Sequence, residues 1–115
     1  MIKKFNFNYK NKKFIMKIKE CNNFFSKIFG LMFRKNSKPL LFNFKKPIRI
    51  SIHSFFCRPF IVIWFLNKRV VDIKRIDSYK ISIKPKNEFD KILEIPSNYK
   101  EFYILSDFID DSRKI

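Results

Sequence analysis

Hydrophobic and polar residues alternate along much of the chain, and this alternation predicts β-strands. Residues 48–56 show it most clearly, because isoleucines at every second position face arginine, serine and histidine on the other side. Residues 61–66 are apolar on both faces and therefore predict a central strand. Further strands are predicted at residues 12–20, 40–44, 70–75, 80–84, 92–95 and 108–109. Short strands at such regular spacing are typical of a β-sandwich or a β-barrel.

Turn and helix signals separate these strands. Asn22 or Asn23 can cap a helix N-terminus, and apolar residues follow at helical spacing as far as Gly30, which suits the left-handed turn that ends a helix. We therefore predict one short α-helix near residues 23–30. Weaker signals predict turns at residues 45–47 and 67–69, a single helical turn at 87–91, and a short helix from Ser97 to about residue 103.

The chain is expected to form one domain, because 115 residues have room for a single hydrophobic core. Residues 12–109 would form this β-rich domain, residues 1–11 either a loose basic arm or an added edge strand, and residues 110–115 a short charged tail. The longest apolar run, residues 60–66, is far shorter than the roughly 20 residues of a membrane-spanning helix, and no signal-peptide pattern precedes it. We expect a cytoplasmic protein with reduced thiols at Cys21 and Cys57.

The charge is strongly basic and unevenly placed. The net charge is +16, and residues 1–49 hold 14 of the 26 basic residues and one of the 10 acidic residues. Such asymmetry indicates a polyanionic partner, RNA or DNA, for the first half of the chain. The expected contacts are Lys3, Lys4, Lys10, Lys12, Lys13, Lys17, Lys19, Arg34, Lys35, Lys45 and Lys46. An AT-rich genome would also enrich Lys, Asn, Ile and Phe together, in which case the lysines are a solubilising surface.

Aromatic residues lie between the first lysines of the chain. Phe5, Phe7, Tyr9 and Phe14 alternate with basic residues, and binders of single-stranded nucleic acid use aromatic rings within basic grooves. If these rings are exposed, the segment predicts weak, sequence-independent binding of RNA or DNA. If they are buried, they belong to the core. Association with a membrane surface is a further alternative, but the apolar residues form no helical stripe.

Few residues are suited to catalysis. Gly30 is the single glycine, which excludes a glycine-rich phosphate loop, and His53 is the single histidine, which excludes a histidine cluster for a metal. Cys57 would lie about 13 Å from His53 along a strand, too far for a Cys–His pair unless the chain bends. We expect no catalytic residue, no metal and no cofactor. A ligand-binding or hydrolytic site near His53 and Glu94 is the alternative.

The order of several short motifs resembles a known family. They are Gly30-Leu31-Met32-Phe33-Arg34, Ser51-Ile52-His53, Phe65-Leu66 and Leu93-Glu94-Ile95-Pro96. In this order they are similar to the family numbered 192 among the domains of unknown function, also called uncharacterised protein family 0127, in its archaeal form. The resemblance implies a compact jelly-roll β-sandwich with a short helix and no established activity or cofactor. It also implies structural roles for Gly30, Leu31, Met32, Arg34, His53, Glu94 and Pro96. One departure is Val62, which stands where family members usually have Asp.

Composition, pattern and resemblance together predict a mostly β, jelly-roll-like sandwich or barrel. They favour a non-enzymatic binding or structural module. Binding of nucleic acid through the basic half, and a small site near His53 and Glu94, are the alternatives.

Overall fold

The structure is a computed structural model that describes residues 2–21, 38–49, 59–76 and 84–113. The predicted helix near residues 23–30 lies outside the described residues, as do most of the strands predicted at 48–56 and 80–84. The described elements are β1 (Ile2–Tyr9), β2 (Lys12–Cys21), β3 (Leu40–Ile48), β4 (Phe60–Leu66), β5 (Arg69–Ile76), β6 (Phe89–Pro96) and α2 (Lys100–Arg113).

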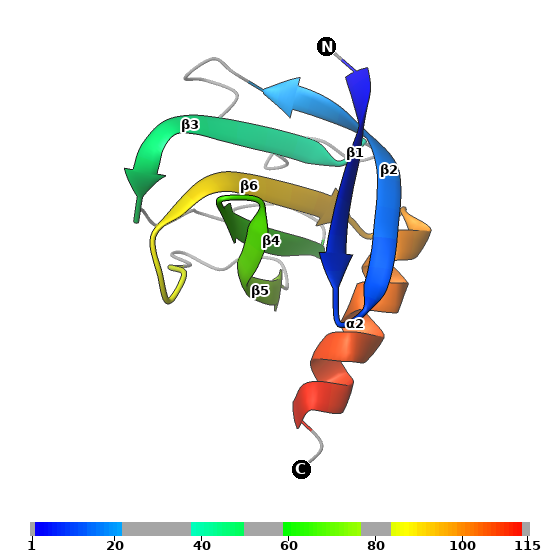
Figure 1. The fold of residues 1–115 in the computed structure, drawn as a ribbon. Helices are drawn as coiled ribbons and strands as arrows, with labels where there is room; N and C mark the ends of the chain where they lie inside the picture. The colour runs from blue at the N-terminus through cyan, green and yellow to red at the C-terminus, as the bar shows by residue number, and fades with distance from the viewer. Residues whose placement is uncertain (1, 22–37, 50–58, 77–83, 114–115) are drawn as a thin grey trace.

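These strands form one curled, mixed sheet with the order β1-β2-β3-β6-β4-β5, and α2 packs beside it (Figure 1). All neighbouring pairs are antiparallel except β2 and β3, which are parallel. The prediction of a mostly β protein is confirmed. A jelly roll divides its strands between two sheets, whereas the six strands of the described segments belong to one sheet that curls into a half-barrel.

Two tight hairpins set the edges of this sheet. Lys10 and Asn11 join β1 to β2 with φ angles of 48° and 64°, and Asn67 and Lys68 join β4 to β5 with φ angles of 51° and 69°. Positive φ at both central residues produces the turn whose twist matches that of paired strands. The turn predicted near residues 67–69 is confirmed. Of the two alternatives for residues 1–11, the structure has the edge strand, β1, paired along its whole length with β2.

Strand β3 runs through a predicted turn. We expected residues 45–47 to end the strand because Pro47 cannot donate a hydrogen bond to a ladder. Instead β3 continues to Ile48, and its register with β6 shifts between Asn43 and Ile48. An irregularity of this kind leaves residues unpaired, so it accommodates the proline. The helical turn predicted at residues 87–91 is also wrong, because Phe89 is buried and already pairs with Ile48 at the start of β6.

The central strand β4 is buried on both faces, as predicted. It lies between β5 and β6 in the sheet. Ile61, Ile63 and Phe65 contribute to a core cluster on one face that also includes α2 residues. Phe60, Val62 and Trp64 contribute to a second cluster on the other face. Because successive strand residues point to opposite faces, an unbroken apolar run is what such a position requires.

The C-terminal segment differs most from the prediction. The short helix expected to end near residue 103, the strand at 108–109 and the tail from residue 110 are replaced by one 14-residue helix, α2. Phe102, Leu105 and Ile109 are spaced to lie on one helix face, and all three are buried in the core that the sheet forms. Because burial of this stripe against the sheet stabilises the helical conformation, the helix continues through the two apolar residues at 108–109.

Candidate functional site

The curl of the sheet brings its two edge strands, β1 and β5, to the same side of the molecule. The rings of Phe5 and Phe7 on β1 each lie 5.5 Å from the ring of Phe65 on β4, next to β5. The space left between the edges is an open groove of about 680 Å³. The groove is lined by Lys3, Lys4, Phe5, Asn6, Phe7, Asn8, Tyr9, Lys10, Phe65, Lys68, Arg69, Val70 and Lys91.

The groove is strongly cationic. Six of its 13 lining residues are Lys or Arg, and among the described residues that line it none is Asp or Glu. Lys3 forms an ion pair with Glu20 of β2, and Lys91 lies 4.0 Å from the carboxylate of Asp90. A concave surface lined by one sign of charge concentrates ligands of the opposite sign. The groove is therefore suited to an anionic ligand.

The floor of the groove is aromatic. Phe7 and Phe65 are 5% and 1% exposed and belong to the core, where Phe7 also stacks on Phe14 at 5.1 Å. Phe5 and Tyr9 are half-buried and keep part of their rings accessible. The ammonium group of Lys10 lies 5.7 Å from the centre of the Tyr9 ring. Of the four aromatic residues singled out in the sequence, two are core residues and two can contact a ligand.

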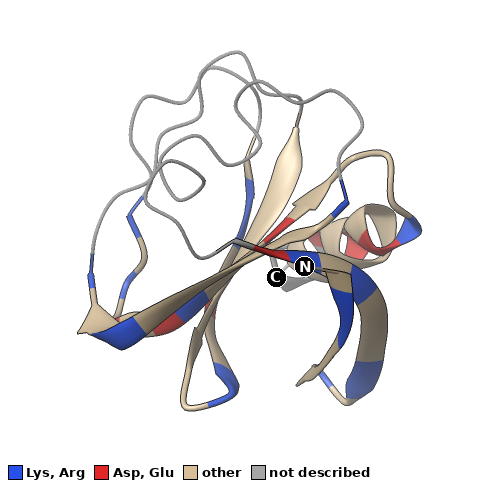
Figure 2. Ribbon diagram, turned by 90° about the horizontal axis from the view of Figure 1, so that it is seen from above, with Lys and Arg blue, Asp and Glu red and all other residues tan. Residues whose placement is uncertain are grey.

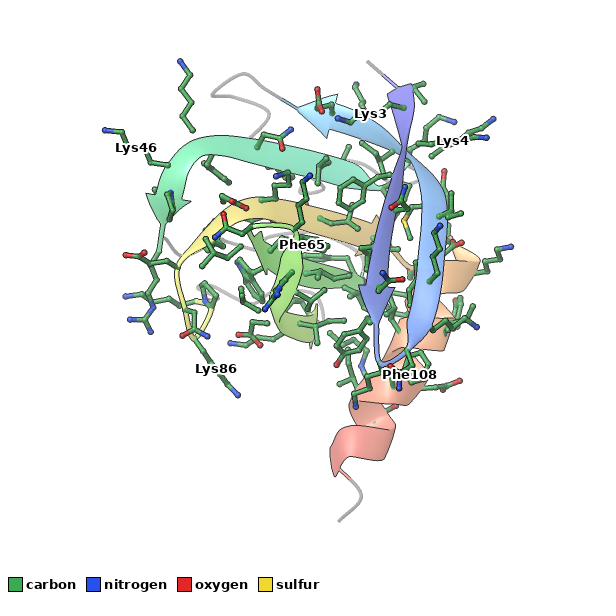
Figure 3. The ribbon with its side chains drawn as sticks, in the orientation of Figure 1. Lys3, Lys4, Lys46, Phe65, Lys86 and Phe108 are labelled. Carbon is green, nitrogen blue, oxygen red and sulfur yellow. The ribbon has the colours of Figure 1, made fainter. Side chains whose placement is uncertain are left out.

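The structure brings together only part of the predicted basic surface. Lys3, Lys4 and Lys10 line the groove, whereas Lys12 lies over the ring of Phe14. Lys46 lies on the other side of the molecule from Lys3 and Lys4 (Figure 3), beside the exposed Lys45 on β3. Three lysines of β2, Lys13, Lys17 and Lys19, are on the outer side of the β1–β2 hairpin. Arg34 and Lys35 lie outside the described residues.

Sequence reasoning missed three cations of the groove. Lys68 belongs to the β4–β5 turn, Arg69 begins β5 and Lys91 belongs to β6, all in the half of the chain that is nearly balanced in charge. Two adjacent basic residues in a predicted turn are an ordinary surface feature. Nothing in the sequence indicates that this turn lies across from β1.

The structure describes only some of the residues to which the family resemblance gives structural roles. Glu94 and Pro96 lie on β6, and Glu94 is 7% exposed, paired in register with Leu40 on one side and Val62 on the other. The residues Gly30, Leu31, Met32, Arg34 and His53 lie outside the described residues. A site that combines His53 with Glu94 therefore stays a prediction.

A second hollow of about 390 Å³ adjoins the groove, and Tyr9 and Asp72 are among the residues that line it. The Asp72 carboxylate accepts hydrogen bonds from the backbone N–H groups of Ile73 at 2.9 Å and Lys86 at 3.1 Å. The pKa of Tyr9 is raised above its ordinary value of 10.0, first by burial of the phenol and second by the negative charge of Asp72. Tyr9 is therefore a neutral hydrogen-bonding group at the end of the groove.

We expect the raised pKa of Tyr9 to make stability fall at alkaline pH. Since the folded-state pKa exceeds the unfolded-state pKa, the contribution of Tyr9 to stability is complete below pH 10.0 and is lost as the pH rises through the folded-state pKa. Ultraviolet absorbance titration of the wild type and of Tyr9→Phe isolates this group among the four tyrosines. In Asp72→Asn the Tyr9 transition should move to lower pH, and an unchanged transition would contradict the assignment to Asp72.

Two other kinds of feature are absent from the described residues. No group of three or more His, Cys, Asp or Glu in these segments is placed to hold a metal ion. No helix among these segments combines the length and apolar character needed to cross a membrane.

The comparisons with known proteins concern the fold. No family model matches the chain, and no curated protein matches it. A solved protein of unknown function from Novosphingobium aromaticivorans DSM 12444 superposes with a TM-score of 0.73 at 15% identity, covering 90% of this chain and 79% of that chain. A solved protein from Sinorhizobium meliloti 1021, described provisionally as a transcription regulator, superposes with a TM-score of 0.68 at 12% identity, covering 79% and 76%. The chain shares the fold of these two proteins, and its resemblance to family 192 stays a prediction.

Proposed function

We propose that this chain is a non-enzymatic binding module that holds single-stranded nucleic acid in the groove between β1 and β5. The observation that carries the proposal is the joint placement of six cations with two accessible aromatic rings and no lining carboxylate among the described residues. Phosphates would contact Lys4, Lys10, Lys68 and Arg69 and release bound counterions. Bases would stack on Phe5 and Tyr9, which present π-faces that accept any base.

The size of the groove favours a single strand over a duplex. Its volume of about 680 Å³ is in the range of pockets that enclose molecules of drug size. Unstacked bases of a single strand can enter such a space, whereas paired bases of a duplex cannot. Stacking and phosphate contacts carry no base-edge readout, so binding would be sequence-independent.

One structural neighbour is compatible with the proposal. The protein from Sinorhizobium meliloti 1021 is described provisionally as a transcription regulator, a class that acts on nucleic acid. Its identity of 12% to this chain shows a common fold only. The proposal therefore depends on the groove. We place this activity in the cytoplasm.

The proposal is tested by fluorescence anisotropy with labelled mixed-sequence RNA and DNA single strands. We expect binding at about 50 mM salt that weakens steeply by about 300 mM, because phosphate contacts release counterions. The double variant Lys68→Ala/Arg69→Ala should bind roughly tenfold more weakly and lower the log–log salt slope by about 0.7 for each phosphate that is no longer neutralised. Both residues are exposed, Lys68 in the turn and Arg69 at the start of β5, so the fold should be retained.

The matched control is Lys45→Ala/Lys46→Ala, which removes the same charge from exposed positions away from the groove. Its affinity should stay within about twofold of the wild type, because charges outside the groove contribute only long-range attraction. Equal losses in the two variants, or no binding by the wild type at low salt, would refute the groove as the binding site.

A further inference from the structure

The β1–β2 hairpin has a second basic surface, on the side opposite its core-facing aromatic residues. The β1 residues of this surface also line the groove, whereas its β2 residues do not. Residues directly opposite each other in an antiparallel pair share a face of the sheet. The inner face holds the pairs Phe5 with Met16 and Phe7 with Phe14, which pack in the core. The alternate positions form the outer ribbon face, which consists of the exposed pairs Lys4 with Lys17, Asn6 with Ile15, and Asn8 with Lys13.

The outer ribbon face has features that are unfavourable in the free protein. Lys4 and Lys17 lie directly opposite each other, and like charges in this position destabilise a strand pair. The nearby carboxylate, Glu20, is engaged with Lys3, whose cross-strand partner Ile18 is fully buried on the inner side. Ile15 is 55% exposed. A surface with paired lysines and an exposed isoleucine is better explained by a partner than by solubility.

Most of the hairpin lies beyond the pairing with β3. Strand β2 pairs with β3 only through Lys19–Cys21, at its far end. The part of the hairpin that carries the outer ribbon face therefore extends beyond the β3 pairing as a two-stranded ribbon, and β1 is the outermost strand of the sheet that the described segments form. Figure 2 shows this ribbon curving away from the central strands, with lysine positions along it. Its outer side is convex, so it fits a groove better than a flat surface.

We infer that the outer ribbon face binds duplex DNA by entering the major groove. The major groove, about 12 Å wide, admits a two-stranded β-ribbon, and the three residue types present are those that read its base edges. Lysine donates to guanine O6 and N7, asparagine forms a bidentate pair with adenine, and an apolar side chain contacts the methyl group of thymine. The inference goes beyond the proposed function, because it adds the β2 residues Lys13, Ile15 and Lys17, which do not line the groove, and a double-stranded ligand.

Other anionic partners fit the outer ribbon face less well. An RNA duplex has a deep, narrow major groove that side chains cannot read. An anionic membrane would attract the lysines and could take up Ile15. However, Asn6 and Asn8 on this face offer amides that base edges can use and acyl chains cannot. The side-chain chemistry therefore favours duplex DNA over a lipid surface.

The test compares two pairs of variants on labelled duplex DNA, duplex RNA and single-stranded DNA. Lys13→Ala/Lys17→Ala should weaken duplex DNA binding about tenfold at low salt and leave single-strand binding within about twofold. Lys68→Ala/Arg69→Ala should weaken single-strand binding about tenfold and leave duplex DNA binding within about twofold. Lys4, Asn6 and Asn8 stay unchanged in these variants because they belong to both surfaces. Lys45→Ala/Lys46→Ala is again the charge-matched control, and thermal melting verifies that each exposed double variant folds.

Base readout is tested separately by selection from a random duplex DNA pool. The wild type should enrich a sequence motif, and Asn6→Ala/Asn8→Ala should reduce that enrichment, because each good bidentate pair discriminates against the wrong base by roughly 5- to 150-fold. A loss for Lys13→Ala/Lys17→Ala no larger than that of the control, or equal affinity for duplex DNA and duplex RNA, would overturn the inference.

The remaining outcomes separate this inference from the proposed function. Binding to phosphatidylserine vesicles without binding to duplex DNA would replace the inference with membrane docking. Duplex binding that is lost in Lys68→Ala/Arg69→Ala but kept in Lys13→Ala/Lys17→Ala would overturn it and leave the groove as the site. Intact duplex binding with no single-strand binding would refute the proposed function alone.

Discussion

Replacing Phe65 with alanine should lower the free energy of unfolding by about 3–5 kcal/mol, a large share of the 5–15 kcal/mol typical of a domain. Phe65 is 1% exposed and lies on the central strand β4. Its ring contacts Phe5 and Phe7 edge-on, both at 5.5 Å, so it ties the edge strand β1 to the centre of the sheet. The substitution removes this packing and leaves a cavity beneath the groove. Urea denaturation followed by circular dichroism measures the loss.

The control for this experiment is Tyr103→Ala on α2. Tyr103 is an aromatic residue of similar size but is 60% exposed, so its removal should cost about 0.5 kcal/mol or less. Phe65→Leu keeps most of the buried volume and should recover more than half of the stability lost in Phe65→Ala. A Phe65→Ala protein as stable as Tyr103→Ala would show that β1 is not held by the Phe65 ring.

The second large effect is expected at Leu105. This residue is fully buried at the middle of the apolar stripe with which α2 packs on the sheet. Leu105→Ala should destabilise the protein by about 2–5 kcal/mol, because the neighbouring side chains cannot close the cavity completely. The midpoint of urea unfolding should fall with little change in its slope, since the surface exposed on unfolding is nearly the same.

Asp107→Ala is the matched control on the same helix. Asp107 is exposed, so its replacement should change the free energy of unfolding by no more than about 0.5 kcal/mol. If Leu105→Ala and Asp107→Ala had equal free energies of unfolding, α2 would not unfold cooperatively with the sheet. Its docking also bears on the groove, because the ring of Phe108 lies 6.2 Å from that of Tyr9.

The β1–β2 hairpin therefore serves three purposes. Its inner aromatic residues complete the core, its free edge forms one wall of the groove, and its outer side carries the outer ribbon face. Period-two alternation allows this, because each strand presents two unrelated sets of side chains. A substitution on the inner face is expected to affect stability, whereas one on the outer face should affect binding alone.

Local pattern was sufficient where neighbouring residues decide the structure. The apolar run of β4 predicted a central strand, because only a strand covered on both faces buries such a run. The turn near residues 67–69 followed from its position between two apolar segments. The strongly basic first half likewise followed from composition. For the strand and the turn, the sequence carries the information within a few residues.

Local pattern failed where distant residues decide the structure. The segments around Pro47 and Phe89 were expected to be a turn and a helical turn, yet pairing between β3 and β6 makes both of them strand. Residues 108–109 resemble a short strand, yet burial beside the sheet draws them into α2. Pairing and burial energies outweigh weak local preferences, and no local window contains both partners.

By itself, the sequence determined that this protein is mostly β, has an unbroken apolar strand at its centre, and carries a large positive charge. Only the tertiary structure decided where that charge acts. Lys10 and Lys68 are far apart in the chain and line one groove because the sheet curls until its two edges face each other. The curl arises from the accumulated twist of six paired strands. That twist is a property of the whole sheet, so no segment of the sequence contains it.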